Sequence, residues 1–179
     1  MGADNHLVTL GHRRIAFVTA RFSPTTQALD AGRRETSVSL SLAAPDGLRF
    51  GVPPPRAVRL GGRLRHRAAT LPRGRSKALF VHSDSEAIGM VERAPDRGLT
   101  VRGGLAVVSY DNEVAAASGP PLTAVRTQRR RLGSQAAETA LARMVDPTKR
   151  PTHRLELWPT LVVRASCGGE ERASSSSDG

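Results

Sequence analysis

The sequence has few aromatic residues and a single cysteine, and both shortages exclude functions. Aromatic residues make up 3% of the 179 residues, too few for a surface that stacks successive nucleobases on aromatic rings. Because Cys167 is alone, neither an internal disulfide nor a thiolate metal cluster can form. The N-terminus lacks a basic-then-apolar leader, and no apolar run approaches the roughly 20 residues of a membrane-spanning helix. These absences predict a cytoplasmic protein without membrane contact.

Acidic residues are missing from one internal stretch, residues 47–83, and this stretch explains most of the charge. It carries nine Lys and Arg side chains, and subtracting these nine from the net charge of +11 leaves +2 for the rest. A pI of about 11.5 is typical of nucleic-acid binders, but here most of the excess positive charge lies in one segment. Two interpretations stay open for it: a solvated or poorly folded segment, or a phosphate-binding surface.

Signatures of catalysis are also absent. The histidines are scattered without metal-ligand spacing, and neither the Gly-x-Ser-x-Gly nucleophile motif nor the phosphate-binding loop motif occurs. His82 and Asp84 could be drawn as an acid–base pair, but such proximity in sequence is common by chance. We therefore expect no enzyme, no metal site and no cofactor.

Apolar runs alternate with helical patterns along the chain. The helices are predicted at about 23–35, 83–94 and 129–145, and the strands at 15–18, 78–81, 105–108, 122–127 and 155–163. Ser83 and Glu86 have the spacing of a capping box at the start of the second helix. Short apolar strands between helices predict an α/β fold with a parallel sheet covered on both faces.

The middle of the chain gives weaker signals. Val38, Leu40 and Leu42 alternate with serines, and the turn sequence at 44–48 precedes a second alternating run. This pattern predicts a β-hairpin over 38–52. Farther on, a helix with a sparse apolar stripe is predicted, and the stripe consists of Val58, Leu60, Leu64 and Leu71.

Polar residues follow three predicted strands. They are found at 19–25, at His82, Ser83 and Asp84, and at Asp111 and Asn112. Ligands of open parallel sheets bind beyond the carboxyl ends of the strands, and carboxylates accept hydrogen bonds from sugar hydroxyls. Ser83 and Asp84 are equally consistent with helix capping, whereas Asp111 has no clear helix to cap and favours binding.

Five motifs in order resemble the sensor domain of LacI/GalR-type bacterial transcriptional regulators. They are HLVTLGHRRIAF at 6–17, ALFVHSDSEAIG at 78–89, RGLTVRGGLAVVSYD at 97–111, PPLTAVR at 120–126 and LVVRAS at 161–166. The resemblance covers residues 6–32 and 77–167, and the segment between them does not share it.

The resemblance implies a parallel-sheet sandwich of the periplasmic-binding-protein-like type I fold. In that scheme residues 1–167 form a partial sensor domain, and 168–179 a disordered tail. Residues 13–118 and 154–167 would make the C-terminal lobe, while 120–146 would cross into an incomplete N-terminal lobe.

The same resemblance implies the effector site. Asp111 would be the ligand-binding acidic residue and Ser83 with Asp84 the polar pair at the neighbouring strand end. Ser23 and Thr25 would contact the effector from the first loop. Leu29 stands where the family usually has an effector-binding arginine, and Ser83 where it frequently has asparagine.

These inferences predict the effector-binding domain of a DNA-binding regulator, with a sugar or nucleoside-like effector. Operator DNA would be bound only through a helix-turn-helix that this chain lacks, and intact relatives would be homodimers. Two alternatives stay open: a solute-binding protein of a sugar transporter, and a non-functional fragment of a regulator gene.

Overall fold

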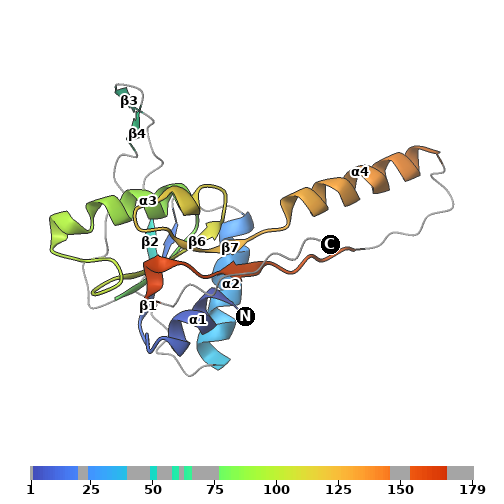
Figure 1. Ribbon diagram of the computed structural model, residues 1–179. Helices are drawn as coiled ribbons and strands as arrows, with labels where there is room; N and C mark the ends of the chain where they lie inside the picture. Colours follow the sequence, from blue (N-terminus) through green and yellow to red (C-terminus); the bar gives the residue numbers. More distant parts are fainter. Residues whose placement is uncertain are drawn as a thin grey trace, which may run out of the picture.

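A computed structural model describes residues 2–19, 24–39, 49–51, 58–60, 63–65, 77–145 and 154–168 (Figure 1). Its helices are α1 Ala3–Thr9, α2 Pro24–Ser39, α3 Asp84–Arg93 and α4 Arg129–Val145, with 3-10 turns η1 Pro95–Arg97, η2 Ala115–Ala117 and η3 Ala165–Cys167. Its strands are β1 Ile15–Thr19, β2 Arg49–Gly51, β3 Val58–Leu60, β4 Arg63–Arg65, β5 Ala78–Val81, β6 Ala106–Asp111, β7 Thr123–Arg126 and β8 Thr160–Val162.

One sheet organises the body of the molecule. Its strand order is β2-β1-β5-β6-β7-β8, and every neighbouring pair is parallel except β7 with β8. Helix α3 covers one face, and α1 and α2 lie on the other (Figure 1). This arrangement confirms the predicted α/β class with a mainly parallel sheet.

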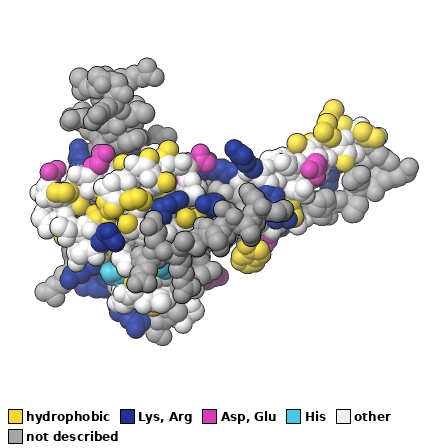
Figure 2. Space-filling model, in the orientation of Figure 1, with side chains coloured by type: hydrophobic (Ala, Val, Ile, Leu, Met, Phe, Trp, Pro, Cys, Tyr) yellow, Lys and Arg dark blue, Asp and Glu magenta, His cyan; other side chains and the backbone are white. Residues whose placement is uncertain are grey.

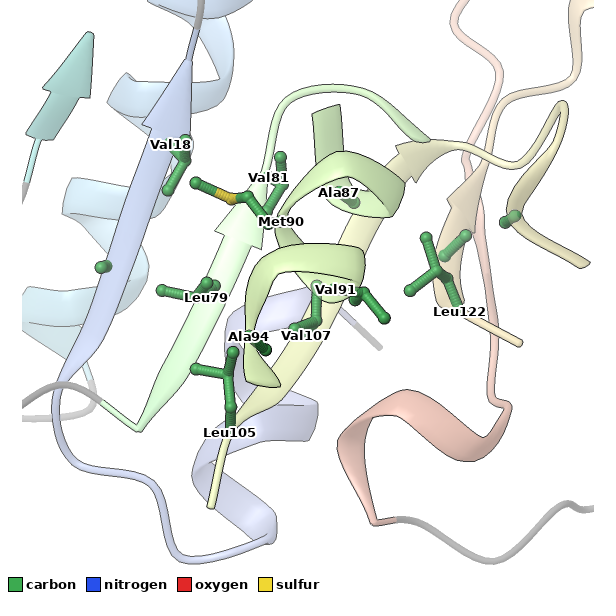
Figure 3. Packing of buried hydrophobic residues seen from close by; sticks show 13 residues of the cluster. Val18, Leu79, Val81, Ala87, Met90, Val91, Ala94, Leu105, Val107 and Leu122 are labelled. Atoms are coloured by element: carbon green, nitrogen blue, oxygen red, sulfur yellow. The ribbon is translucent and has the colours of Figure 1, made fainter. Parts of the chain in front are cut away.

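The core forms on both faces because the central strands are apolar on both sides. On one face Leu79 and Val107 pack against Met90 and Val91 of α3, all nearly inaccessible to solvent (Figure 3). On the other face the rings of Phe17 and Phe80 lie 5.6 Å apart between their centroids. Burial of these side chains stabilises the body and fixes where its strands end.

The opposite face also buries charge between α1 and α2. Asp4 and Arg33 are 7% and 6% exposed, and Arg33 lies over the ring of Phe17. Burial raises the pKa of Asp4 to about 6, although the nearby charge of Arg33 lowers it. The sequence patterns did not predict α1, because its seven residues have no cap or apolar stripe long enough to stand out.

Most predicted elements around the site are confirmed. Strands β1, β5, β6 and β7 lie at the predicted positions, and α4 has the predicted bounds. Ser83 caps α3, Pro95 begins η1, and Gly98 takes a left-handed conformation with φ +67° that ends this segment. The last strand is shorter than predicted, because only 160–162 pair with β7.

The predicted hairpin over 38–52 is wrong. Val38 belongs to α2 and is 76% exposed, so its alternation with serine reflects a solvated helix end. Residues 49–51 do form a strand, but it pairs in parallel with β1 at the sheet edge. Residues 40–48 lie outside the described part of the chain. Long-range pairing with β1 determined the partner of this strand, which local periodicity cannot report.

The sparse helix predicted from Val58 to Leu71 is also wrong where the structure describes it. β3 and β4 pair antiparallel, with Val58 opposite Arg65. Gly61 and Gly62 lie outside the described residues, and consecutive glycines disfavour a helix. The proposed phosphate-binding role of the arginines in 47–83 stays a prediction.

Helix α4 projects from the body as an arm (Figure 1). None of its residues is buried, and its apolar side chains include Leu132 at 53% and Leu141 at 63% exposure. Figure 2 shows hydrophobic side chains gathered over its distal part. The assignment of 120–146 to a crossover between lobes stays a prediction, as do the other lobe boundaries. Among the described residues, every helix is too short or too polar to traverse a bilayer.

Candidate effector site at the carboxyl edge of the sheet

The carboxyl ends of β1, β5, β6 and β7 meet at one edge, because these strands are mutually parallel. The first turn of α3 and the loop after β6 therefore lie at the same edge. Four of the five predicted site residues are described there: Thr25, Ser83, Asp84 and Asp111. Ser23 lies outside the described residues, and its predicted role is neither supported nor weakened.

Asp84 is 2% exposed and organises the loop after β6. One carboxylate oxygen accepts a hydrogen bond from the hydroxyl of Ser109 at 2.5 Å. The other accepts hydrogen bonds from the backbone N–H groups of Glu113 and Val114 at 2.6 and 3.0 Å. Protein donors thus already use both oxygens. This geometry gives Asp84 a positioning role, and among the described residues its hydrogen bonds go to the loop after β6 and Ser109 and not to His82. Direct contact of Asp84 with an effector stays a prediction.

Ser83 is half-buried and caps α3. Its hydroxyl oxygen accepts the backbone N–H of Glu86 at 3.4 Å. The capping interpretation of Ser83 is confirmed by this bond, but a half-buried hydroxyl at the site edge can still meet a ligand. The capping bond does not test the predicted contact of Ser83 with an effector, which stays a prediction.

Asp111 ends β6 and forms the centre of an ion-pair network. Its carboxylate lies 2.6 Å from Nη2 of Arg129, and Nη1 of the same guanidinium lies 3.1 Å from Glu113. The side chain of Asp111 is 27% exposed, so the pair remains open to solvent. A hydrogen bond from Arg129 to Asp111 raises the pKa of Arg129. Sequence reasoning missed Arg129, because its meeting with Asp111 depends on how α4 leaves β7.

The backbone at this point is unusual. Asp111 and Asn112 both have positive φ, at 109° and 59°. Asn tolerates this region better than most residues, whereas two successive non-glycine residues there carry strain. Such strain concentrates at binding and catalytic sites, where surrounding contacts hold it. The loop amides held by Asp84 supply contacts of this kind.

Four buried polar atoms at this edge have no hydrogen-bond partner among the described residues. They are Nδ1 of His82, Oε2 of Glu86, Oδ1 of Asn112 and Oγ1 of Thr127. Each follows the end of a strand or lies in the first turn of α3. Buried polar groups without partners are rare, since each costs about 1–3 kcal/mol. The position of these four atoms at one edge favours a site for a polar ligand there.

The ionisation of nearby groups follows from burial. Burial lowers the pKa of His82, although the charge of Asp111 raises it, so the imidazole is neutral at pH 7. Burial raises the pKa of Glu86 to about 7, while hydrogen bonding to Ser83 lowers it. Burial also raises the pKa of Tyr110, as does Asp111, whereas Arg129 lowers it. The edge therefore offers neutral imidazole, amide and hydroxyl groups beside carboxylates.

Thr25 is exposed in the first turn of α2, the helix that follows β1. Since β1 is parallel to β5, this turn lies at the same edge of the sheet. No interaction of Thr25 with the other candidates is described, so its place in the site stays a prediction.

An apolar groove lies on the arm. It has a volume of about 440 Å³. Its lining comes from α4 and the returning chain, namely Leu132, Gln135, Ala136, Thr139, Ala140, Arg143 and Leu155. Since none of the predicted effector residues lines it, the groove is a separate feature. In the described ranges, no three His, Cys, Asp or Glu side chains gather as metal ligands would.

Comparison with known proteins agrees with this architecture. A family model described as a periplasmic binding protein-like domain matches residues 5–167. The match continues through residues 33–75, which the sequence motifs left unassigned.

Individual relatives are transcriptional repressors and regulators. The HTH-type transcriptional repressor PurR of Vibrio campbellii is 30% identical over 166 residues, covering 90% of this chain and 48% of the relative. The crystal structure of the transcription regulator GntR from Chromobacterium violaceum is 33% identical with a TM-score of 0.73, covering 92% of this chain and 60% of that one. A transcriptional regulator CelR–cellobiose complex is 27% identical with a TM-score of 0.72, covering 90% of this chain and 49% of that one. The chain thus spans about half the length of the curated relative that it matches.

Proposed function

The chain belongs to the periplasmic binding protein-like domain family, and from this membership we propose that it is the effector-binding domain of a LacI-type transcriptional regulator. The effector is a sugar or a nucleoside-like molecule bound at the carboxyl edge of the sheet. In the whole regulator, effector binding changes the affinity of a separate helix-turn-helix for operator DNA in a cytoplasmic homodimer. The chain has no catalytic role in this proposal.

The observation that carries the proposal is the polar edge itself. Asp111 offers a partly exposed carboxylate, and His82, Asn112 and Thr127, whose buried polar atoms have no partner in the described ranges, follow the ends of β5, β6 and β7. Sugars present many hydroxyl groups that donate and accept hydrogen bonds, and such groups satisfy mixed donors and acceptors of this kind. The cellobiose complex of a structural neighbour supports a sugar as the ligand class.

The arm supports the expected second lobe. In α4, Leu132 and Leu141 are more than half exposed, and an apolar groove runs beside them. Exposed apolar surface of this kind commonly marks an interaction surface. We assign it to packing against the N-terminal lobe of the intact sensor, with residues 120–146 as the crossover.

Nuclear magnetic resonance tests the proposal on the chain itself. Titration of ¹⁵N-labelled protein with cellobiose, D-ribose and a purine nucleoside, each to millimolar concentration, should shift amide signals of residues 82–86 and 110–114. Asp111→Asn should weaken binding about tenfold, because a hydrogen bond to a charged group contributes about 1.5–3 kcal/mol.

Asp96→Asn is the matched control, since Asp96 is exposed in η1 after the opposite end of α3. It should leave the affinity unchanged. If no compound of the panel shifts the amide signals of residues 82–86 and 110–114, the proposed sensor role of this chain is wrong. The solute-binding protein of a transporter would bind a sugar too, so a second measurement is needed: the full-length protein should bind operator DNA with a sugar-dependent affinity.

A further inference from the structure

Glu86 is an acidic side chain buried in an unexpected place. It is 9% exposed, and its Oε2 atom has no hydrogen-bond partner in the described ranges. Ionised carboxylates are seldom buried without a cation or several donors, because desolvation of the charge is costly. Ala87, Met90 and Val91 supply the apolar face of α3, and the hydrogen bond between Glu86 and Ser83 at the helix start leaves Oε2 without a partner in the described ranges.

The position of Glu86 on α3 directs it to the candidate site. Residues four apart lie on one face of a helix, so Glu86 shares a face with Met90. Met90 reaches towards Val18 and Val81, the residues near the ends of β1 and β5 (Figure 3). Glu86 lies one turn closer to the helix N-terminus and therefore closer to the carboxyl edge.

The charges at this edge indicate which ligand it would accept. The described carboxylates near this edge belong to Asp84, Glu86, Asp111 and Glu113, and the described arginines after β6 and in β7 and the first turn of α4 are Arg126, Arg129, Arg130 and Arg131. Arg129 is already paired with two of these carboxylates. Glu86 itself has no ion-pair partner in the described part of the chain, so a phosphate group placed against it would meet an uncompensated carboxylate, whereas a hydroxyl group would find an acceptor.

We propose that Glu86 is a specificity-determining residue of the effector site, whose buried carboxyl group accepts a hydroxyl of an uncharged polyol such as a neutral sugar. This inference rests on the proposed effector-binding function and adds the ligand class and the residue that selects it. Two other buried polar atoms without a partner in the described ranges, in His82 and Asn112, follow the neighbouring strands β5 and β6.

The experiment combines binding with stability for the full chain. Glu86→Gln and Glu86→Leu should each raise the dissociation constant for a neutral sugar that binds the wild type, about tenfold or more for Leu and less for Gln, which keeps an acceptor. Glu86→Gln should also raise the thermal unfolding midpoint at pH 8, because it keeps a polar group for Ser83 and removes the desolvated charge of a buried carboxylate. Glu92→Gln, at an exposed position of the same helix, should change neither quantity.

Four outcomes overturn the inference. Unchanged sugar affinity in both Glu86 variants does so while leaving the sensor function intact. A lowered unfolding midpoint in Glu86→Gln does so as well, because the carboxyl group then has a structural role. Tighter binding of glucose 6-phosphate than of glucose would contradict the uncharged ligand class. A wild type that binds no sugar refutes the effector-binding proposal itself, and the role of Glu86 with it.

Discussion

Helices α3 and α4 are both predicted from amphipathic patterns, yet they meet different surroundings. α3 buries six of its ten residues against the sheet, whereas α4 buries none of its seventeen. Met90 of α3 is fully buried, and Met144 of α4 is 80% exposed. A periodic apolar stripe thus determines that a helix forms and which face is apolar, but not whether another surface covers that face.

The stability of the body should therefore depend on its apolar residues, and that of the arm should not. Leu79→Ala removes a fully buried side chain under α3 and should lower the free energy of unfolding by about 3 kcal/mol. Leu141→Ala, at 63% exposure on α4, should change it by no more than about 0.5 kcal/mol. Urea denaturation measures both values. Equal losses would show that the face of α4 is covered in solution, for example by a second copy of the chain.

A smaller difference should appear in the pH dependence of stability. The pKa of Asp4 is raised from 3.8 to about 6 in the folded body, so the folded state binds a proton more tightly than the unfolded state does. The stability from this proton is fully present below pH 3.8 and is lost as pH rises through 6. Asp4→Asn removes this dependence, so its unfolding free energy relative to wild type should rise by on the order of 2 kcal/mol between pH 4 and 7.

Glu138→Gln is the control in the arm, where the carboxylate is exposed. Its unfolding free energy relative to wild type should stay constant over the same pH range. If the Asp4→Asn difference were equally flat, the buried environment of Asp4 between α1 and α2 would be disproved.

The smallest expected effect is confined to the arm. A Cβ at Gly133 of α4 would meet nothing within 4 Å, and alanine is favoured over glycine inside a helix by about 1 kcal/mol. Because α4 lacks tertiary packing, Gly133→Ala should slow amide hydrogen exchange in residues 132–145 by up to about fivefold, while exchange in β5 and β6 stays the same. Strong protection of α4 in the monomeric wild type would contradict the exposed arm.

Much of the body could be predicted from sequence because its signals are local. Four-residue apolar runs identified the central strands, and Ser83 with Glu86 marked the start of α3. The hairpin predicted over 38–52 was wrong because it too relied on a local pattern. Val38 alternates with serines inside a solvated helix, and residues 49–51 found their partner in β1, distant in sequence.

Some features of the candidate site could likewise be predicted from the sequence and others could not. Asp111 and Asp84 could be placed at neighbouring strand ends from the order of the elements alone. The ion pair of Asp111 with Arg129 and the bonds from Asp84 to the loop amides could not, because they depend on the angle at which α4 and the loop after β6 leave the sheet.

The sequence by itself determined the α/β class, the central strands, the bounds of α4 and the polar strand ends, since apolar periodicity and capping act over a few residues. Only the tertiary structure decided that α4 stands exposed, that the carboxylate of Asp84 is used by the protein, and that Glu86 is buried without a full set of partners. Burial and hydrogen-bond satisfaction depend on groups brought together from distant parts of the chain, and no local pattern encodes them.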